Sequence, residues 1–594
     1  MSTNNHSKTA PKNNPQTGIR KGLTRYGDTE FSLFLRKAFI KAMGFSDNAL
    51  DRPIIGITNT FSDFNPCHGN VPQMIEAIKR GVMQAGGMPM VFPTISIHES
   101  FAFPTSMYLR NLMALDTEEM MRSQPVDAVV LVGGCDKTIP AQLMAAASLD
   151  VPVLSIPTGP MLTTLHQGDR LGACTDCRRY WGKFRAGEID QAEIDEINGK
   201  LAPTTGTCMV MGTASTIACM VEAAGLSLPG TAAAPAVTAE RFRLSELTGR
   251  RAVELGKTAS EGHFSPRTIL SPEALTNALI VLHAIGGSTN ALIHFTAIAA
   301  RLGIKLDLEH FDRLGRDIPV LVDLKPSGSH YMEHLYEDGG LMGVLRELKP
   351  HLYLDCLTVS GRTLGEEIDA AKVTKARKVI RIASDPIYPV GGLAVLKGNL
   401  APRGAVIKHS AASPNLLKHR GRAVVFKSLE DLALRVDNPD LDVTADDILV
   451  LQNAGPKGAP GMPEAGYLPI PKKLAQAGVK DMVRISDARM SGTAFGTIVL
   501  HVAPESAENG PLAIVQDGDM ITLDVEKRLL QLELDDAEIQ RRIAALEAPA
   551  KRLNIPKTGY RHLYQTTVTQ ADVGCDFDFM VPSAHGVVPL LKGN

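Results

Sequence analysis

The chain has 594 residues, more than a single hydrophobic core ordinarily organises, so two or more domains are expected. Its 44% hydrophobic and 21% charged residues are typical of a soluble globular protein. The 62 basic and 64 acidic residues leave a net charge of −2, which argues against a nucleic-acid or membrane partner, because either would favour a basic excess or a basic block.

The first 20 residues are polar and lack the apolar stretch of a secretory signal. They predict a flexible N-terminal arm. No uninterrupted apolar run approaches the roughly 20 residues that a membrane-spanning helix needs. A cytoplasmic location is therefore expected.

Strand-like and helix-like segments alternate in the first part of the chain. Helical apolar spacing over residues 71–85 and 140–148 falls between short, continuously apolar segments, which are residues 53–58, 88–92, 127–132 and 153–156. This alternation predicts a parallel sheet covered by helices on both faces. Residues 203–300 are rich in alanine and predict further helices.

The pattern changes near residue 385. Short apolar segments there are mostly separated by turn residues, and they lie at 392–396, 405–407, 423–426, 448–451, 482–485 and 497–500. They predict a β-rich, barrel-like domain. The expected organisation is an arm over residues 1–20, an α/β domain over 21–385 and a barrel-like domain over 386–594.

Three of the eight cysteines occupy similar positions in this pattern. Cys67 and Cys135 each lie between a predicted strand and a predicted helix, and Cys208 directly precedes a helical stretch. Loops at the carboxyl ends of parallel strands form ligand sites, and a thiol near a helix N-terminus ionises more easily to the metal-binding thiolate. These thiols are therefore candidates for one metal cluster. Because 68 and 73 residues separate them, buried packing residues remain an alternative.

A second cysteine pattern is the CxxC of Cys174 and Cys177. Such a pair occurs in redox sites and zinc half-sites, but a zinc site would need a second pair, and His166 alone is a poor candidate. A redox CxxC usually opens a helix after a strand, which the preceding residues do not indicate. We expect a structural or loop role for both, and packing roles for Cys219, Cys356 and Cys575.

The glycine-rich segments do not match a nucleotide-binding loop. The chain has neither GxxxxGK[ST] nor a GxGxxG after a strand, so NAD and ATP are not implied. Residues 286–290, Gly-Gly-Ser-Thr-Asn, are consistent with an anion-binding turn or with an ordinary tight turn.

Seven segments, taken together and in order, resemble the family of dihydroxy-acid, sugar-acid and phosphogluconate dehydratases. They are Asn65-Pro66-Cys67, Gly134-Cys135-Asp136-Lys137-Thr138, Gly206-Thr207-Cys208, Gly286-Gly287-Ser288-Thr289-Asn290, Asn399-Leu400-Ala401-Pro402, Gly461-Met462-Pro463-Glu464 and Ser486-Asp487-Ala488-Arg489-Met490-Ser491-Gly492. The resemblance runs from about residue 50 to Asp578. It implies an N-terminal α/β domain, a C-terminal β-barrel domain, and a homodimer or a tetramer of paired dimers.

The resemblance also implies two cofactors. One is a [2Fe-2S] cluster with an open iron position, held by Cys67, Cys135 and Cys208. The other is a magnesium ion, held by Glu99, Asp136, Glu464 and a carbamylated Lys137. Hard oxygen ligands suit magnesium, and an open iron position can act as a Lewis acid on a leaving hydroxyl group.

Ser491 matches the family's catalytic base, and with Thr493 it is expected in the substrate site. The alternatives are that Asp136 is only a helix cap, Lys137 an ordinary surface lysine and Ser491 only a turn residue. The expected reaction removes water from a 2,3-dihydroxy carboxylic acid and leaves a 2-keto acid.

The motifs around residues 134–148, 486–493 and 574–579 look more like the sugar-acid branch, which dehydrates aldonic acids such as arabinonate or xylonate. The alternative is a dihydroxy-acid dehydratase of branched-chain amino-acid synthesis. Residues 174–181 depart from the expected sugar-acid pattern. A phosphorylated substrate is disfavoured because no basic cluster is evident. A more remote alternative is a non-catalytic iron–sulfur protein or a zinc protein.

Overall fold

The computed structural model describes residues 17–372, 377–581 and 588–589. Its N-terminal part contains a four-stranded parallel sheet in the order β2-β1-β3-β4. The strands are β1 (Ile54–Asn59), β2 (Met88–Pro93), β3 (Ala128–Gly133) and β4 (Val153–Pro157). All four lie within a few residues of the predicted segments, and the predicted parallel sheet is confirmed.

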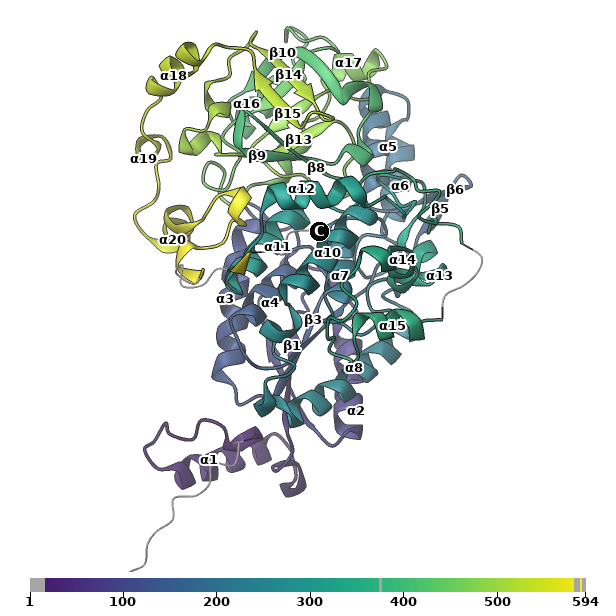
Figure 1. Cartoon of the computed structure of the whole chain (residues 1–594), viewed down its shortest axis with the longest axis vertical. Helices are drawn as coiled ribbons and strands as arrows, with labels where there is room; N and C mark the ends of the chain where they lie inside the picture. The colour runs from purple at the N-terminus through teal and green to yellow at the C-terminus, as the bar shows by residue number, and fades with distance from the viewer. Residues whose placement is uncertain (1–16, 373–376, 582–587, 590–594) are drawn as a thin grey trace, which may run out of the picture.

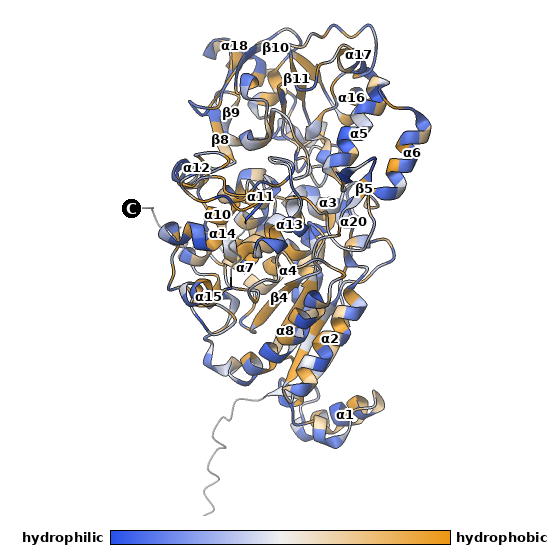
Figure 2. Cartoon of the chain, turned by 90° about the vertical axis from the view of Figure 1, so that its right-hand side faces the viewer, coloured by the Kyte–Doolittle hydropathy of each residue, from blue (hydrophilic) through white to orange (hydrophobic). Residues whose placement is uncertain are grey.

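Helices enclose this sheet and extend the α/β part. They are α2 (Val71–Gln84), α3 (Ser106–Ser123), α4 (Thr138–Ala147), α5 (Thr175–Ala186), α6 (Gln191–Lys200), α7 (Thr213–Ala223), α8 (Ala239–Lys257), α9 (Pro266–Ile269), α10 (Pro272–Ala284), α11 (Asn290–Arg301), α12 (Leu308–Asp317), α13 (Met332–Glu337), α14 (Gly340–Leu348) and α15 (Leu364–Ala370). Figure 2 shows α2 and α8 side by side, with apolar residues toward the sheet. The helix-rich prediction for residues 203–300 is confirmed.

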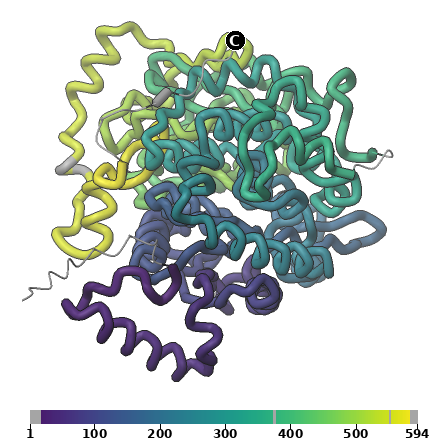
Figure 3. The backbone as a smooth tube through the Cα atoms, turned by 60° about the horizontal axis from the view of Figure 1, so that its bottom comes forward, coloured from purple at the N-terminus to yellow at the C-terminus, as the bar shows by residue number. Residues whose placement is uncertain are grey.

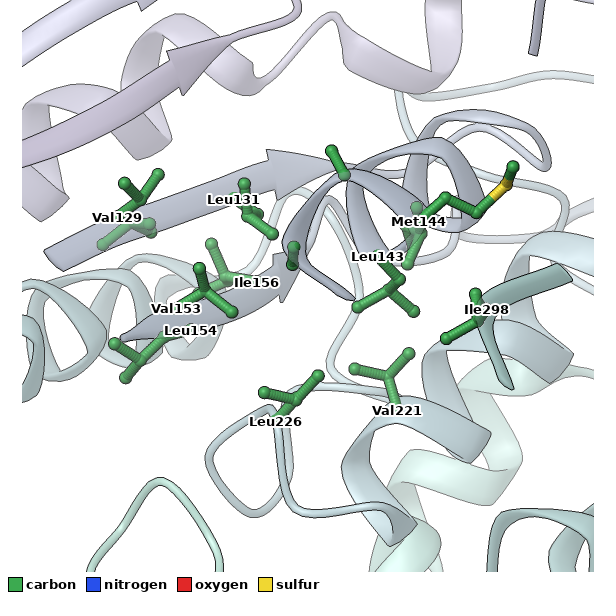
Figure 4. Close-up of a cluster of buried hydrophobic side chains, with 14 of the residues drawn as sticks. Val129, Leu131, Leu143, Met144, Val153, Leu154, Ile156, Val221, Leu226 and Ile298 are labelled. Carbon is green, nitrogen blue, oxygen red and sulfur yellow. The ribbon is translucent and has the colours of Figure 1, made fainter. Parts of the chain in front are cut away.

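The core of the α/β part lies between strands and helices that are buried on all sides. Val129 and Leu131 on β3 and Ile156 on β4 face Leu143 of α4 and Val221 of α7 (Figure 4), and all five side chains are almost fully buried. Strands covered on both faces need continuous apolar sequence, which explains why their sequence segments were easy to recognise.

The C-terminal part is a closed barrel, as predicted. Its eight strands run in the order β10-β11-β12-β13-β9-β8-β15-β14. They are β8 (Ala394–Gly398), β9 (Ala401–Ile407), β10 (Lys418–Phe426), β11 (Ile448–Leu451), β12 (Arg484–Ser486), β13 (Ile498–Ala503), β14 (Met520–Asp524) and β15 (Leu529–Leu532). In Figure 1 the barrel lies above the α/β part, and α5 lies alongside it. The last two strands were not predicted.

Neighbouring strands from β10 to β13 pair in parallel. The carboxyl ends of β11 and β12 therefore open at the same edge of the barrel, as parallel strands require. The remaining C-terminal helices are α16 (Leu429–Arg435), α17 (Lys472–Gln476), α18 (Asp536–Ala544), α19 (Pro549–Arg552) and α20 (Gly559–Thr567).

The N-terminal segment makes contacts with the α/β part before the predicted end of the arm at residue 20. Most of the predicted arm, residues 1–16, lies outside the described residues, but Gly18 and Ile19 are buried and the Gly18 N–H donates to Asp127 Oδ2 at 2.8 Å. Helix α1 (Thr29–Ala42) follows at the edge of the molecule (Figure 3), where Leu33 and Ile40 pack against the core and Phe34 and Phe39 are exposed. The limits predicted for the two domains stay a prediction.

None of the described helices combines the length and apolarity required to cross a membrane.

Candidate active site

A cavity of about 1130 Å³ opens between the sheet and the barrel. Loops from both parts line it. Cys67 follows β1, Glu99 follows β2 and Cys135 follows β3, whereas Glu464 and Ser491 come from the segments after β11 and β12. The cavity thus lies at the carboxyl ends of two sets of parallel strands, where open α/β sheets bind their ligands.

The three predicted cluster cysteines all reach this cavity. The Sγ atoms of Cys67 and Cys135 and a ring nitrogen of His98 lie within 4.8 Å of one another. Cys208 is not part of that group. Its nearest cysteine neighbour is Cys174, whose Sγ lies 3.1 Å from Sγ of Cys208. His98 and Cys174 were not predicted at the site.

His68 joins the loops that carry Cys67 and Cys135. Its Nδ1 lies 2.7 Å from the Thr60 carbonyl oxygen, and its Nε2 accepts the backbone N–H groups of Gly134 and Cys135 at 3.0 and 3.1 Å. This pattern requires a neutral ring with the proton on Nδ1. Burial lowers the pKa of His68 to about 4, which keeps the ring neutral near pH 7.

Three carboxylates meet beside the thiols. One oxygen from each of Glu99, Asp136 and Glu464 lies within 4.8 Å of the other two. Lys137 has a fully buried side chain whose Nζ contacts Asp136 and lies 3.6 Å from Glu99 Oε2. The surface-lysine alternative for Lys137 is therefore wrong. So is the helix-cap alternative for Asp136, because the N-cap of α4 is Lys137 and no side chain caps it.

Arg489 ties these carboxylates together across the two parts of the chain. Its buried guanidinium donates to Glu464 Oε1 at 2.6 Å and to Glu99 Oε2 at 3.0 Å. Sequence reasoning did not assign it a role, because 390 positions separate it from Glu99. Since carboxylates at this spacing repel one another, Arg489 and Lys137 supply the compensating positive charge.

The two glutamates differ in how readily they ionise. Burial opposes ionisation of Glu99, but Arg489, Lys137 and two hydroxyl hydrogen bonds lower its pKa well below the ordinary value. Burial raises the pKa of Glu464, and the nearby charge of Arg489 only partly offsets it. A bound cation would favour the ionised form of both carboxyls.

Ser491 is presented to the cavity by a tightly packed loop. Its Oγ is 2.8 Å from Oγ1 of Thr493, which also lines the cavity. Asn290 Nδ2 donates to the Met490 carbonyl at 3.0 Å. This hydrogen bond joins the Gly-Gly-Ser-Thr-Asn segment to the loop that carries Ser491. That segment is buried, and the choice between its two predicted roles stays a prediction.

Gly492 allows the close approach that this loop requires. A Cβ at this position would lie 2.5 Å from Ser288 Oγ and 2.8 Å from the backbone nitrogen of Thr213. We expect Gly492→Ala to lower the free energy of unfolding by about 1–3 kcal/mol, the usual cost of overpacking. It should also displace Ser491 and reduce turnover. Thermal denaturation measures the first effect.

Gly199→Ala is the matched control, because nothing lies within 4 Å of a Cβ added there. It should leave stability unchanged or slightly raised. An equal melting temperature for both variants would contradict the account of Gly492.

Helix α5 forms one wall of the cavity and corrects two expectations. Cys174 is its N-cap residue and lies three positions after the end of the short strand β6 (Asp169–Leu171), so the CxxC does open a helix after a strand. The helix and a nearby loop also place a basic cluster at the cavity, made of Arg178, Arg179, Lys183, Arg185 and Lys480. The expected lack of a basic cluster is therefore wrong.

The basic side chains of this cluster differ in whether they form ion pairs. Arg179 pairs with Asp176 at 3.0 Å, and Arg185 pairs with an aspartate of the barrel at 2.7 Å. Arg178 instead donates to Thr493 Oγ1 at 2.9 Å and to the Cys174 carbonyl at 3.2 Å, with no acidic partner among the described residues. It is the cation best placed to reach a ligand beside Ser491.

The fold and the site together define an enzyme-type cavity, lined by thiols and carboxylates, between an α/β part and a closed barrel. Sequence profiles agree in both parts. Residues 52–367 match the dihydroxy-acid/6-phosphogluconate dehydratase N-terminal domain, and residues 378–575 match the C-terminal domain of the same description. The chain belongs to the dihydroxy-acid/6-phosphogluconate dehydratase family.

Relatives within this family match nearly end to end. The chain is 47% identical to an L-arabonate dehydratase of Azospirillum brasilense, over 95% of this chain and 97% of the relative. It is 44% identical to a 6-deoxy-6-sulfo-D-gluconate dehydratase of Pseudomonas putida, over 89% and 91%. A dihydroxy-acid dehydratase of Acetivibrio thermocellus is 38% identical, over 91% and 96%.

Proposed function

We propose that this chain removes water from an aldonic sugar acid such as arabinonate or xylonate and leaves a 2-keto-3-deoxy acid. The observation that carries the proposal is one cavity lined by cluster-type thiols, three convergent carboxylates and Ser491. Relatives that act on sugar acids share 44–47% of its residues, whereas the dihydroxy-acid dehydratase shares 38%.

The thiols fit the [2Fe-2S] cluster that the family resemblance implies. Cys67, Cys135 and Cys208 would hold it, because each lies at the cavity and thiolates are the ligands that iron–sulfur clusters use. A zinc protein is the rival. Analysis of the purified protein should find about two irons and two sulfides per chain; zinc alone would favour the rival.

The carboxylates fit a magnesium ion. Glu99, Asp136 and Glu464 offer converging oxygen atoms, the ligands that magnesium prefers. Addition of carbon dioxide to the Lys137 ammonium group would release two protons and replace a buried cation by an anionic carbamate with two further oxygens. The contacts of Lys137 Nζ with two of the carboxylates support this role.

When bound, the iron supplies a Lewis acid for the departing C3 hydroxyl group, and the magnesium ion stabilises negative charge on the substrate carboxylate and the C2 oxygen. Ser491 Oγ, ionised to an alkoxide, takes the proton from C2, and Thr493 Oγ1, 2.8 Å away, orients that oxygen. The C3 hydroxyl group then leaves with a proton as water. Arg489 holds Glu99 and Glu464 in place. The resulting enol takes a proton at C3 and becomes the 2-keto acid.

A panel of acids tests the choice of substrate. We expect kcat/KM for arabinonate or xylonate to exceed that for a branched 2,3-dihydroxy-3-methyl acid by about 10-fold or more, or ~1.4 kcal/mol in transition-state binding. A preference for the branched acid would overturn the proposed substrate class. The basic cluster of α5 makes a hexonate with a terminal phosphate or sulfonate the necessary third member, and a preference for it would overturn the pentonate assignment.

Arg178 should contribute to binding of the acid. Because its guanidinium reaches the hydroxyl beside Ser491, Arg178→Ala should remove a charged hydrogen bond to substrate, which is worth about 1.5–3 kcal/mol. The expected result is a rise in KM of about 10- to 100-fold, measured by steady-state kinetics. Arg243→Ala makes the same charge change on an exposed part of α8 and should leave KM unchanged. Equal KM values in the two variants would contradict the role of Arg178.

Removal of magnesium separates the two metal sites. Chelation of the loaded enzyme should abolish activity while the visible absorbance of the cluster persists, and added magnesium should restore turnover, because the carboxylate and thiol sets use different ligands. Activity that survives exhaustive chelation would contradict the magnesium site. Electron density at Lys137 Nζ addresses the carbamate directly.

We further propose that the chain forms a homodimer or a tetramer of paired dimers, with no nucleic-acid or membrane partner. The exposed aromatic side chains of α1 support association, since large apolar groups are seldom left in water without a partner. Light scattering of the full chain should give at least twice the 63.8 kDa of one chain.

A further inference from the structure

We propose that Cys174 is a fourth sulfur ligand of the cluster and that it binds the same iron as Cys208 whenever no substrate is present. The proposal rests on the proposed function, because it assumes a cluster at Cys67, Cys135 and Cys208. It assigns a role to a cysteine for which the family resemblance implies none.

The distance between two sulfur atoms carries the proposal. Sγ of Cys174 lies 3.1 Å from Sγ of Cys208. Two thiolates on one tetrahedral ion with metal–sulfur bonds near 2.3 Å, the value for zinc, lie about 3.8 Å apart. A change of well under 1 Å would therefore bring both sulfurs into the geometry of a shared metal ion. Both residues line the cavity that Cys67 and Cys135 also line.

The cysteines form two pairs, one for each iron of a two-iron cluster with four cysteine ligands. Cys67 and Cys135 lie within 4.8 Å of each other, and Cys174 and Cys208 lie together at the other position. Three ligands alone would leave one iron with a single protein sulfur. Since Cys67 and Cys135 share one side, the iron with the vacant position is the one that Cys208 holds, and Cys174 is its neighbour.

Two other side chains near the cluster position are less suited to this role. His98 lies with Cys67 and Cys135 rather than with Cys208, and its Nδ1 accepts the Ser100 N–H at 3.2 Å. Cys177 lies on α5 one turn after Cys174, but its Sγ donates to the Cys174 carbonyl oxygen at 2.6 Å, and its thiol contacts Cys174 rather than Cys208. Among the described residues, Cys174 alone places a thiol directly against Cys208.

The binding is a ligand exchange without electron transfer. Cys174 loses its thiol proton to solvent when its sulfur binds iron, and it regains a proton when the substrate's C3 hydroxyl group takes its place. The oxidation states of both irons stay the same. In the resting enzyme the cluster would then have four sulfur ligands from the protein, and substrate binding would open the position needed for catalysis.

Spectra of the loaded, substrate-free enzyme test this assignment. The cluster reduced with dithionite should show shifted electron paramagnetic resonance g-values in Cys174→Ala, because one iron loses a sulfur ligand. The matched Cys177→Ala spectrum should superimpose on that of the unmodified protein. Added substrate should move the unmodified spectrum toward that of Cys174→Ala. Superimposable spectra of Cys174→Ala and the unmodified protein would overturn the proposal.

Alkylation of the unmodified enzyme tests the same proposal even if Cys174→Ala fails to assemble its cluster. When the loaded enzyme is treated with iodoacetamide and its peptides are analysed by mass, Cys174 should be protected and Cys177 modified. Removal of iron, or addition of substrate, should expose Cys174. Rapid modification of Cys174 in the loaded, substrate-free enzyme, or a Cys174–Cys208 disulfide there, would overturn the proposal. Absence of iron and sulfide would instead overturn the proposed function.

Discussion

Ser491→Ala should lose about 10²–10⁴-fold in kcat, or more, while it keeps its fold and its cluster absorbance. The substitution removes one oxygen atom from a loop that is held by other contacts, among them the hydrogen bond from Asn290 to the Met490 carbonyl. The lost oxygen is the one proposed to take the C2 proton. Exchange of that proton with solvent deuterium should also stop, and nuclear magnetic resonance of bound substrate or product measures it.

Ser100→Ala is the matched control, because Ser100 lines the same cavity and the described contacts give its hydroxyl no partner in the site. It should keep near-normal turnover. If Ser491→Ala also kept near-normal turnover, Ser491 would be only a turn residue, and the base would have to be another group near the carboxylates.

Cys135→Ser should bleach the visible absorbance and abolish turnover. Cys135 is buried, and its loop is bonded to His68, so the substitution of sulfur by oxygen changes little volume and leaves the backbone contacts in place. A serine hydroxyl does not replace a thiolate in holding iron at neutral pH. Iron and sulfide analysis together with the absorption spectrum measures the loss.

Cys177→Ser provides the comparison, since Cys177 lies in the same cavity but donates to a backbone carbonyl that a serine can also reach. It should keep both cluster and activity. A colourless but active Cys135→Ser protein would contradict the cluster assignment.

Most of the fold could be predicted because its strands carry simple patterns. Strands β3 and β4 of the α/β sheet are buried on both faces and therefore appear in the sequence as continuous apolar runs, as Ala128–Gly133 does. The barrel strands Met520–Asp524 and Leu529–Leu532 were missed because buried and half-exposed positions alternate in them, which leaves a weaker signal. Gly18 was assigned to a flexible arm because nothing local indicates its contact with Asp127.

The site was predictable only where short motifs carry it. Asp136 and Lys137 stand next to Cys135 in the sequence, so the resemblance reached all three at once. Arg489 lies within a quoted motif, yet its pairing with Glu99 depends on how the barrel meets the sheet. The contact of Cys174 with Cys208 spans 34 positions and depends on the loop that precedes α5. Such contacts arise from tertiary packing, which no local pattern reports.

The measurement that tests the central claim most directly is the fate of an aldonic acid in deuterium oxide, followed by nuclear magnetic resonance with the iron- and magnesium-loaded enzyme. The account predicts a 2-keto-3-deoxy acid that has lost one water and carries one deuterium at C3, because the enol takes its proton there from solvent. A product that retains both hydroxyl groups, or an oxidised acid that has lost no water, would contradict it.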